Sequence, residues 1–104
     1  MSLEDLARDY RTGFLRYLPR RSEVAMTAGY ELGRRAANGG ASLLDLVQVH
    51  HRILGEVLTG APSPDTTQVV EAACEYLSEV LSTFDMAHRV LHDPALEPPS
   101  PDDQ

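Results

Sequence analysis

The sequence predicts an all-α domain, a four-helix bundle whose last helix is the longest. A length of 104 residues suits one domain with a single hydrophobic core. Hydrophobic residues make up 42% of the chain, which has only two Phe, four Tyr and no Trp. Leu, Ala and Val predominate among them and recur at three- and four-residue steps. This pattern favours helices packed on helices over a β-sheet.

The first predicted helix begins after Ser2 and ends before Pro19. Ser2 is a suitable N-cap, with Asp5 at the reciprocal position of a capping box, and proline cannot continue the helix. Its predicted core face comprises Leu3, Leu6, Ala7, Tyr10, Phe14, Tyr17 and Leu18.

The second predicted helix begins after Ser22 and ends at Asn38-Gly39-Gly40, which favours a left-handed stop. Its predicted core residues are Val24, Ala25, Ala28, Leu32 and Ala36. A stripe of small residues also runs along this helix: Ala25, Gly29, Gly33 and Ala36 or Ala37. Each helical Gly costs about 1 kcal/mol relative to Ala, so the stripe predicts a close crossing with another helix in the core.

The third predicted helix opens with a capping box at Ser42 and Asp45 and ends in the turn of residues 60–64. Its predicted core face is Leu43, Leu46, Val47, His50, Ile53, Leu54, Val57 and Leu58. Ser63 and Pro64 are then the cap and first-turn proline of a fourth helix, from about Asp65 to His92. At 1.5 Å per residue the fourth helix is roughly 42 Å long, against about 25 Å for the two before it.

The length of the fourth helix predicts a homodimer. Its apolar residues continue to the far end, which the shorter helices of one chain do not reach: Val69, Val70, Ala73, Tyr76, Leu77, Val80, Leu81, Phe84, Ala87 and Leu91. A second copy beside this helix is the simplest cover, with Phe84, Ala87 and Leu91 in the interface. The alternative is a curved helix with a frayed end.

Charge and composition divide the chain into a folded domain of residues 1–92 and an acidic, Pro-rich linker or tail of residues 93–104. The tail contains four prolines and the acids Asp93, Glu97, Asp102 and Asp103, and the net charge of the chain is -7. An acidic domain without a basic stripe argues against nucleic-acid and membrane-surface partners. The sequence has no signal peptide or long apolar run, so we expect a cytoplasmic protein.

Two adjacent histidines, His50 and His51, raise the question of an active site. Neighbouring helix positions point about 100° apart, so these two imidazoles cannot chelate one metal ion. His50 lies on the apolar face and is expected to be a core imidazole bonded to a neighbouring helix. His51 is expected at the solvated rim, where it remains an alternative candidate as the phosphoacceptor of a histidine phosphotransfer or histidine-kinase dimerisation domain.

Other chemistry-bearing residues predict no catalytic site. His88 and His92 have the i, i+4 spacing of metal ligands with Asp85 one turn before, but a third firm ligand is missing. No nucleophile motif or phosphate-binding loop occurs, and the single Cys74 cannot form an internal disulfide. We therefore expect no catalytic residue, no cofactor and no metal site.

The order of residues resembles the N-terminal domain of RsbU-type serine phosphatases, which regulate the bacterial general stress sigma factor. The resemblance rests on Tyr10 with the following RTGFLRYL, on Arg34-Arg35, on ASLLDLVQVHHRILGEV of residues 41–57, and on SEVLSTFDMAH of residues 78–88. Residues 3–92 are covered, and His50 matches a family histidine within an I-x-x-H-R-like run. This match favours a structural role for His50.

The resemblance implies a non-catalytic, dimeric four-helix domain that precedes a metal-dependent serine phosphatase domain. In the family such a domain binds a kinase-like switch protein, RsbT, and the docking activates the phosphatase. The family contacts lie on exposed faces of the second and fourth helices and correspond here to Thr27, Ser78 and Ser82. These three residues are small and polar, whereas docking surfaces usually also contain apolar anchors.

Overall fold

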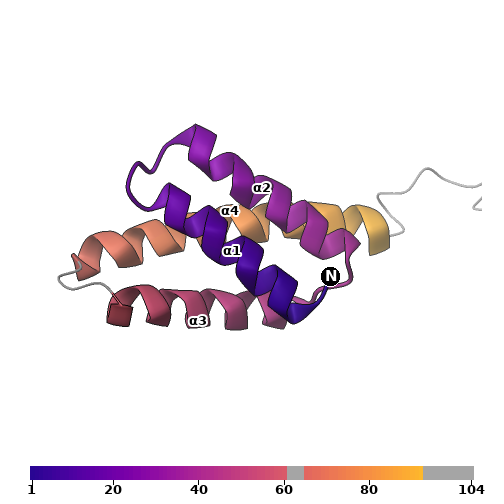
Figure 1. Cartoon of the computed structure of the whole chain (residues 1–104). Helices are drawn as coiled ribbons and strands as arrows, with labels where there is room; N and C mark the ends of the chain where they lie inside the picture. Colours follow the sequence, from indigo (N-terminus) through magenta and orange to yellow (C-terminus); the bar gives the residue numbers. More distant parts are fainter. Residues whose placement is uncertain (61–64, 93–104) are drawn as a thin grey trace, which may run out of the picture.

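The computed structural model describes residues 1–60 and 65–92, which form four helices (Figure 1). These are α1 (Leu3–Tyr17), α2 (Glu23–Asn38), α3 (Leu43–Gly60) and α4 (Thr66–His92). The described residues contain no strand, so the all-α prediction is confirmed. With 27 residues, α4 is the longest helix, about 40 Å at 1.5 Å per residue.

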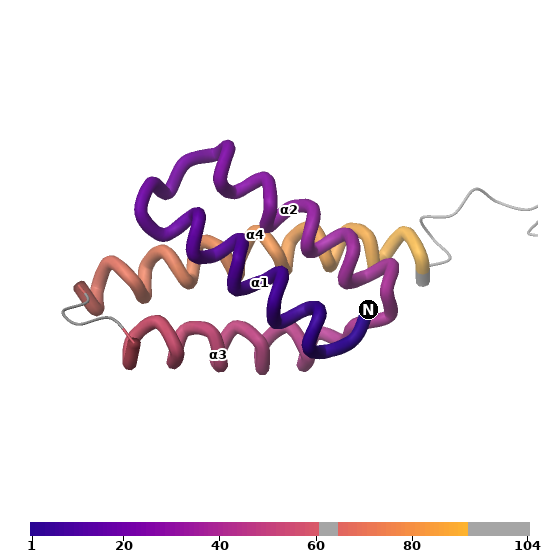
Figure 2. The backbone as a smooth tube through the Cα atoms, viewed as in Figure 1, coloured from indigo at the N-terminus to yellow at the C-terminus, as the bar shows by residue number. Residues whose placement is uncertain are grey.

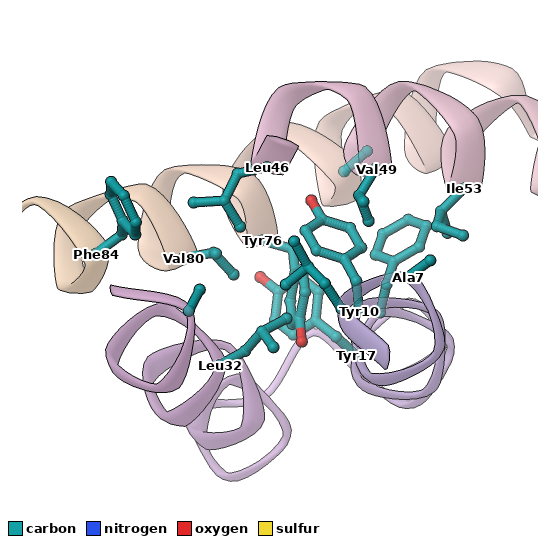
Figure 3. Packing of buried hydrophobic residues seen from close by; sticks show 14 of the residues in the cluster. Ala7, Tyr10, Tyr17, Leu32, Leu46, Val49, Ile53, Tyr76, Val80 and Phe84 are labelled. Atoms are coloured by element: carbon teal, nitrogen blue, oxygen red, sulfur yellow. The ribbon is translucent and has the colours of Figure 1, made fainter. Parts of the chain in front are cut away.

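The helices form two layers that enclose one core. Helix α2 packs on α4 and α1 packs on α3, while α1 also contacts α2 and α3 contacts α4. Figure 3 shows the core side chains between the α3 and α4 ribbons on one side and the α1 and α2 ribbons on the other. In Figure 2, α3 and α4 run in opposite directions, and the N-terminus lies near the end of α2.

Side chains cap the helix starts as the sequence predicts. The hydroxyls of Ser2 and Ser22 accept hydrogen bonds from backbone N–H groups three residues further on. At α3 both bonds of the capping box form: Ser42 Oγ accepts from the Asp45 N–H and Asp45 Oδ2 accepts from the Ser42 N–H, each at 3.0 Å. Asp65 caps α4 through the Gln68 N–H at 3.2 Å, and the predicted Ser63 cap lies outside the described residues.

The predicted left-handed stop of α2 is confirmed at Gly40, whose φ is +81°. The preceding Gly39 has a φ of -85° and is the cap residue. The Ala41 N–H then donates to the Ala36 carbonyl at 2.9 Å, which closes a Schellman-type turn and satisfies one of the last carbonyls.

Tyr76 of α4 lies at the centre of the core, and three aromatic rings of α1 surround it. Its ring centroid is 5.2 Å from that of Tyr10 and 5.9 Å from those of Phe14 and Tyr17. Burial raises the pKa of the Tyr76 phenol to about 12. A Cβ at Gly13 would collide with this hydroxyl, so the glycine in α1 makes room for it.

Four residues predicted to be buried are exposed in the structure, namely Leu3, Val24, Leu43 and Val47. Leu3, Val24 and Leu43 lie in the first turns of their helices, where the neighbouring helices do not reach. Val49 and Ala72, absent from the predicted core faces, are fully buried. The apolar stripe of a helix is thus wider than the face that the bundle covers.

Helices α2 and α4 approach each other most closely at Gly33, as the small-residue stripe predicts. A Cβ on Gly33 would lie 2.4 Å from the Val80 carbonyl oxygen and 2.9 Å from the Phe84 backbone nitrogen. Both atoms belong to the backbone of α4 and cannot move without shifting the helix. The absence of a side chain at Gly33 therefore sets the separation of α2 and α4.

Gly33→Ala should destabilise the domain by about 2 kcal/mol or more, because the added methyl group must push α4 away. Gly55→Ala is the matched control: a Cβ at this α3 position meets nothing within 4 Å. It should stabilise the domain by up to about 1 kcal/mol through helix propensity. Urea denaturation of both variants measures the difference, and equal free energies of unfolding would contradict the close crossing.

Candidate functional site

An open groove runs between the first half of α2 and the middle of α4. Thr27 lies on the α2 side and Ser78 on the α4 side, so the structure brings together two predicted partner-binding residues from distant parts of the sequence. Both are exposed. Ser82, the third predicted residue, is exposed one turn further along α4, beyond the residues that line the groove.

Apolar side chains also line this groove. Val24 is 85% exposed and Tyr30 is 44% exposed. Cys74 of α4 is exposed beside them, and Met26 lies buried below. Sequence reasoning assigned Val24 to the core and missed Tyr30. The i, i+3 spacing of Val24, Thr27 and Tyr30 on one face of α2 is the signal that could have identified them.

Arg21, in the turn between α1 and α2, closes one end of the groove. Its backbone has a φ of +49°, a left-handed conformation that is costly for a residue with a side chain. The guanidinium donates two hydrogen bonds to the Glu75 carboxylate of α4, and the Tyr17 hydroxyl donates a third at 2.7 Å. These bonds, from Arg21 first and then Tyr17, hold the pKa of Glu75 below its usual value. The turn is thereby tied to α4.

The groove is acidic overall. Three carboxylates, those of Glu23, Glu75 and Glu79, line it together with the single guanidinium of Arg21. The charge of Glu79 and its hydrogen bond with the phenol raise the pKa of Tyr30. The groove therefore combines an acidic rim with apolar and small polar side chains.

The structure places the two adjacent histidines in different environments. The Tyr10 hydroxyl of α1 and His50 Nδ1 of α3 are 3.0 Å apart, and His50 is half-buried. The prediction of a core imidazole bonded to a neighbouring helix is confirmed. His51 is exposed, as predicted.

The predicted histidine pair at the end of α4 does not form a metal site among the described side chains. The His88 ring stacks on Phe84, with ring centroids 5.5 Å apart and an interplanar angle of 15°. The side chain of His92 lies outside the described part of the structure. Within the described residues, no three His, Cys, Asp or Glu side chains are close enough to hold a metal ion.

The three predicted dimer residues differ in exposure. Phe84 lies in the core of its own chain, Ala87 is half-buried and Leu91 is 46% exposed. An interface at this end of α4 would therefore use Leu91 more than the ring of Phe84. None of the helices described here is both long and apolar enough to cross a membrane.

A small all-α bundle with an open groove between two helices belongs to the class of helical regulatory domains. The model of one family, phosphoserine phosphatase RsbU, N-terminal domain, matches residues 8–87. This match covers more than three quarters of the chain and runs from α1 into the second half of α4, so the chain belongs to this family. The domain is thus a regulatory domain of a phosphatase. No curated protein and no solved structure matches the chain.

Protonation of His50 should make the stability of the domain depend on pH. Burial, and secondarily the nearby His51, lower the pKa of His50 from its usual value of 6.5. The unfolded chain therefore binds this proton first as the pH falls, and the free energy of unfolding decreases between about pH 7 and pH 5. The measurement is urea denaturation at several pH values in this range, above the range in which most carboxylates titrate.

His50→Gln is the variant that isolates this contribution, since it retains a polar side chain next to Tyr10. Its free energy of unfolding should change less between pH 7 and pH 5 than that of the wild type. His51→Gln, at the exposed neighbouring position, serves as the control. A pH dependence that is the same in the wild type and in His50→Gln would show that this imidazole is not responsible.

Proposed function

We propose that this domain recruits a kinase-like switch protein of the RsbT type and that the docking activates a serine phosphatase of the general stress response. Membership of the RsbU N-terminal family supports the regulatory part of this proposal. The observation that carries the docking part is the groove between α2 and α4, which brings Thr27 and Ser78 together. The proposed location of this event is the cytoplasm.

The groove has the composition expected of a protein-docking surface. Val24 and Tyr30 offer exposed apolar anchors on α2, and small residues, Thr27 and Ser78, allow a partner backbone to approach closely. A few such anchors usually provide most of the binding free energy of an interface, while polar neighbours exclude water. Ser82 extends the same surface along α4.

In the proposed mechanism, docking acts through α4. This helix forms one wall of the groove and also contributes Tyr76 and Val80 to the core. A partner that binds one arrangement of α2 and α4 more tightly shifts the population toward that arrangement. The altered position of α4 is then passed on to a phosphatase domain, which in this proposal follows the acidic segment of residues 93–104.

The proposal includes a homodimer. The exposed apolar residues of the last turns of α4 support this part, since Met86, Val90 and Leu91 are all accessible there. Apolar side chains gathered on an exposed surface are typical of an interaction site. A dimer would place two docking grooves and two copies of α4 in one assembly.

Thr27→Arg and Ser78→Arg should each weaken binding of a purified RsbT-type switch protein by at least tenfold, because a long charged side chain would fill the groove. Isothermal titration calorimetry of the domain with this protein measures the change. Thr12→Arg on α1 is the matched control, since Thr12 is exposed and does not line the groove. Equal affinities of all three variants and the wild type would contradict docking in this groove.

A further inference from the structure

A second apolar stripe runs along α3 on its outer side. Its members recur in alternating steps of three and four residues: Leu44, Val47, His51, Leu54 and Leu58. The core residues of α3, by contrast, are Leu46, Val49 and Ile53. Alternating three- and four-residue steps are the heptad pattern of helices that pack side by side.

Helix α4 carries a matching stripe. It also follows steps of four and three residues over almost the whole helix: Val70, Cys74, Leu77, Leu81, Phe84, His88 and Leu91. None of the twelve positions in the two stripes is Asp, Glu or Arg. We call the surface formed by these two stripes the outer face.

The two stripes lie on the side of the α3–α4 layer that α1 and α2 leave uncovered. Helix α1 occupies the other side of α3, where Arg11 binds Glu56 at 2.9 Å and Glu4 binds Arg52 at 3.2 Å. Helix α2 crosses the other side of α4 at Gly33. Because α3 and α4 contact each other and run antiparallel, their stripes form one surface two helices wide.

Much of the outer face is accessible although it is apolar. Leu44 is 62% exposed and Val47 is 42% exposed. Leu58 and Leu77 are half-buried, but neither belongs to the core cluster or packs against it. Leu54 and Leu81 lie where the outer face joins the core.

We infer that the outer face is the surface on which a second copy of this chain packs, so that two α3–α4 pairs form an intermolecular four-helix arrangement. This inference rests on the proposed homodimer and specifies its interface. It replaces an interface confined to the end of α4 with one that includes α3.

The occupant follows from the geometry of the stripes. A single bound helix would cover one groove of heptad positions, whereas a surface two helices wide needs a second surface of the same width. The outer face of another copy has this width and this spacing, and a twofold axis makes identical patches complementary. The α4 stripe spans about 32 Å and the α3 stripe about 21 Å at 1.5 Å per residue, so the partner's helices would also cover the overhanging end of α4.

His51 acquires a structural explanation in this arrangement. It is the one polar residue in the α3 stripe, between Val47 and Leu54. A single polar residue at a heptad position often fixes the register and the number of helices in a bundle. His51 would thus help to align the two copies.

Val47→Glu and Leu58→Glu test the inference by placing a charge on the outer face without entering the core. Sedimentation equilibrium of the 104-residue chain should show a dimer for the wild type and at least a tenfold higher dissociation constant for each variant. Circular dichroism should show unchanged helix content in both, because neither side chain belongs to the core cluster. Val24→Glu is the control: it adds the same charge at an exposed apolar position of α2 and should leave the dimer unchanged.

The outcomes separate this inference from the proposed function. A wild-type chain that stays monomeric at high concentration would overturn both the homodimer and the outer-face interface. A wild-type dimer whose affinity is unchanged by Val47→Glu and Leu58→Glu would overturn the outer-face interface alone. Loss of the dimer in Val24→Glu with retention in the other two would assign the interface to the α2 side instead.

Discussion

The close approach of α2 and α4 at Gly33 is the constraint on which the arrangement of this domain depends. The backbone atoms of Val80 and Phe84 occupy the space that a side chain at position 33 would need. Toward the start of α2 the contact changes, since the ring of Tyr76 lies against Gly29, with Cε1 3.2 Å from the position of a Cβ. Further along, the two helices border the groove. The groove thus exists because α2 and α4 meet closely at one point and separate from it.

Surface ion pairs connect the helices around this core, but they contribute less than the packing. Asp9 joins Arg35 of α2 at 2.9 Å, and Arg11 joins Glu56 of α3 at the same distance. All four side chains are at least partly accessible to water, where such pairs are typically worth less than about 1 kcal/mol. Their role is to select one register of the helices. The core around Tyr76 provides the cohesion that these pairs then orient.

Local signals in the sequence predicted the helices and their ends well. The caps at Ser2, Ser22 and Ser42 and the left-handed Gly40 depend on a few adjacent residues, so the chemistry of each can be recognised without a tertiary structure. The small-residue stripe also predicted a close crossing correctly, since a glycine inside a helix needs a reason to be there. Its partner helix, α4, could not be inferred from the stripe itself.

The groove, in contrast, depends on how helices distant in sequence diverge. Val24 has the same apolar character as a core residue, and only the position of α4 determines that it stays exposed beside Tyr30. Thr27 and Ser78 were identified through the family resemblance, because no local pattern distinguishes them from other small polar residues on helix surfaces. Periodicity alone cannot separate a residue that is buried in its own chain from one that awaits a partner.

Helix α4 presents three different surfaces, and their angular separation explains how one helix can link them. Successive residues point about 100° apart, so Glu75 lines the groove, Tyr76 enters the core and Leu77 belongs to the outer face. A rotation or shift of α4 that improves the groove for a docked protein must therefore also move Tyr76 and Leu77. Because the packed core resists continuous deformation, such a shift is expected to occur between discrete arrangements. In this way the proposed docking at Ser78 and the inferred dimer contact at Leu77 become parts of one equilibrium.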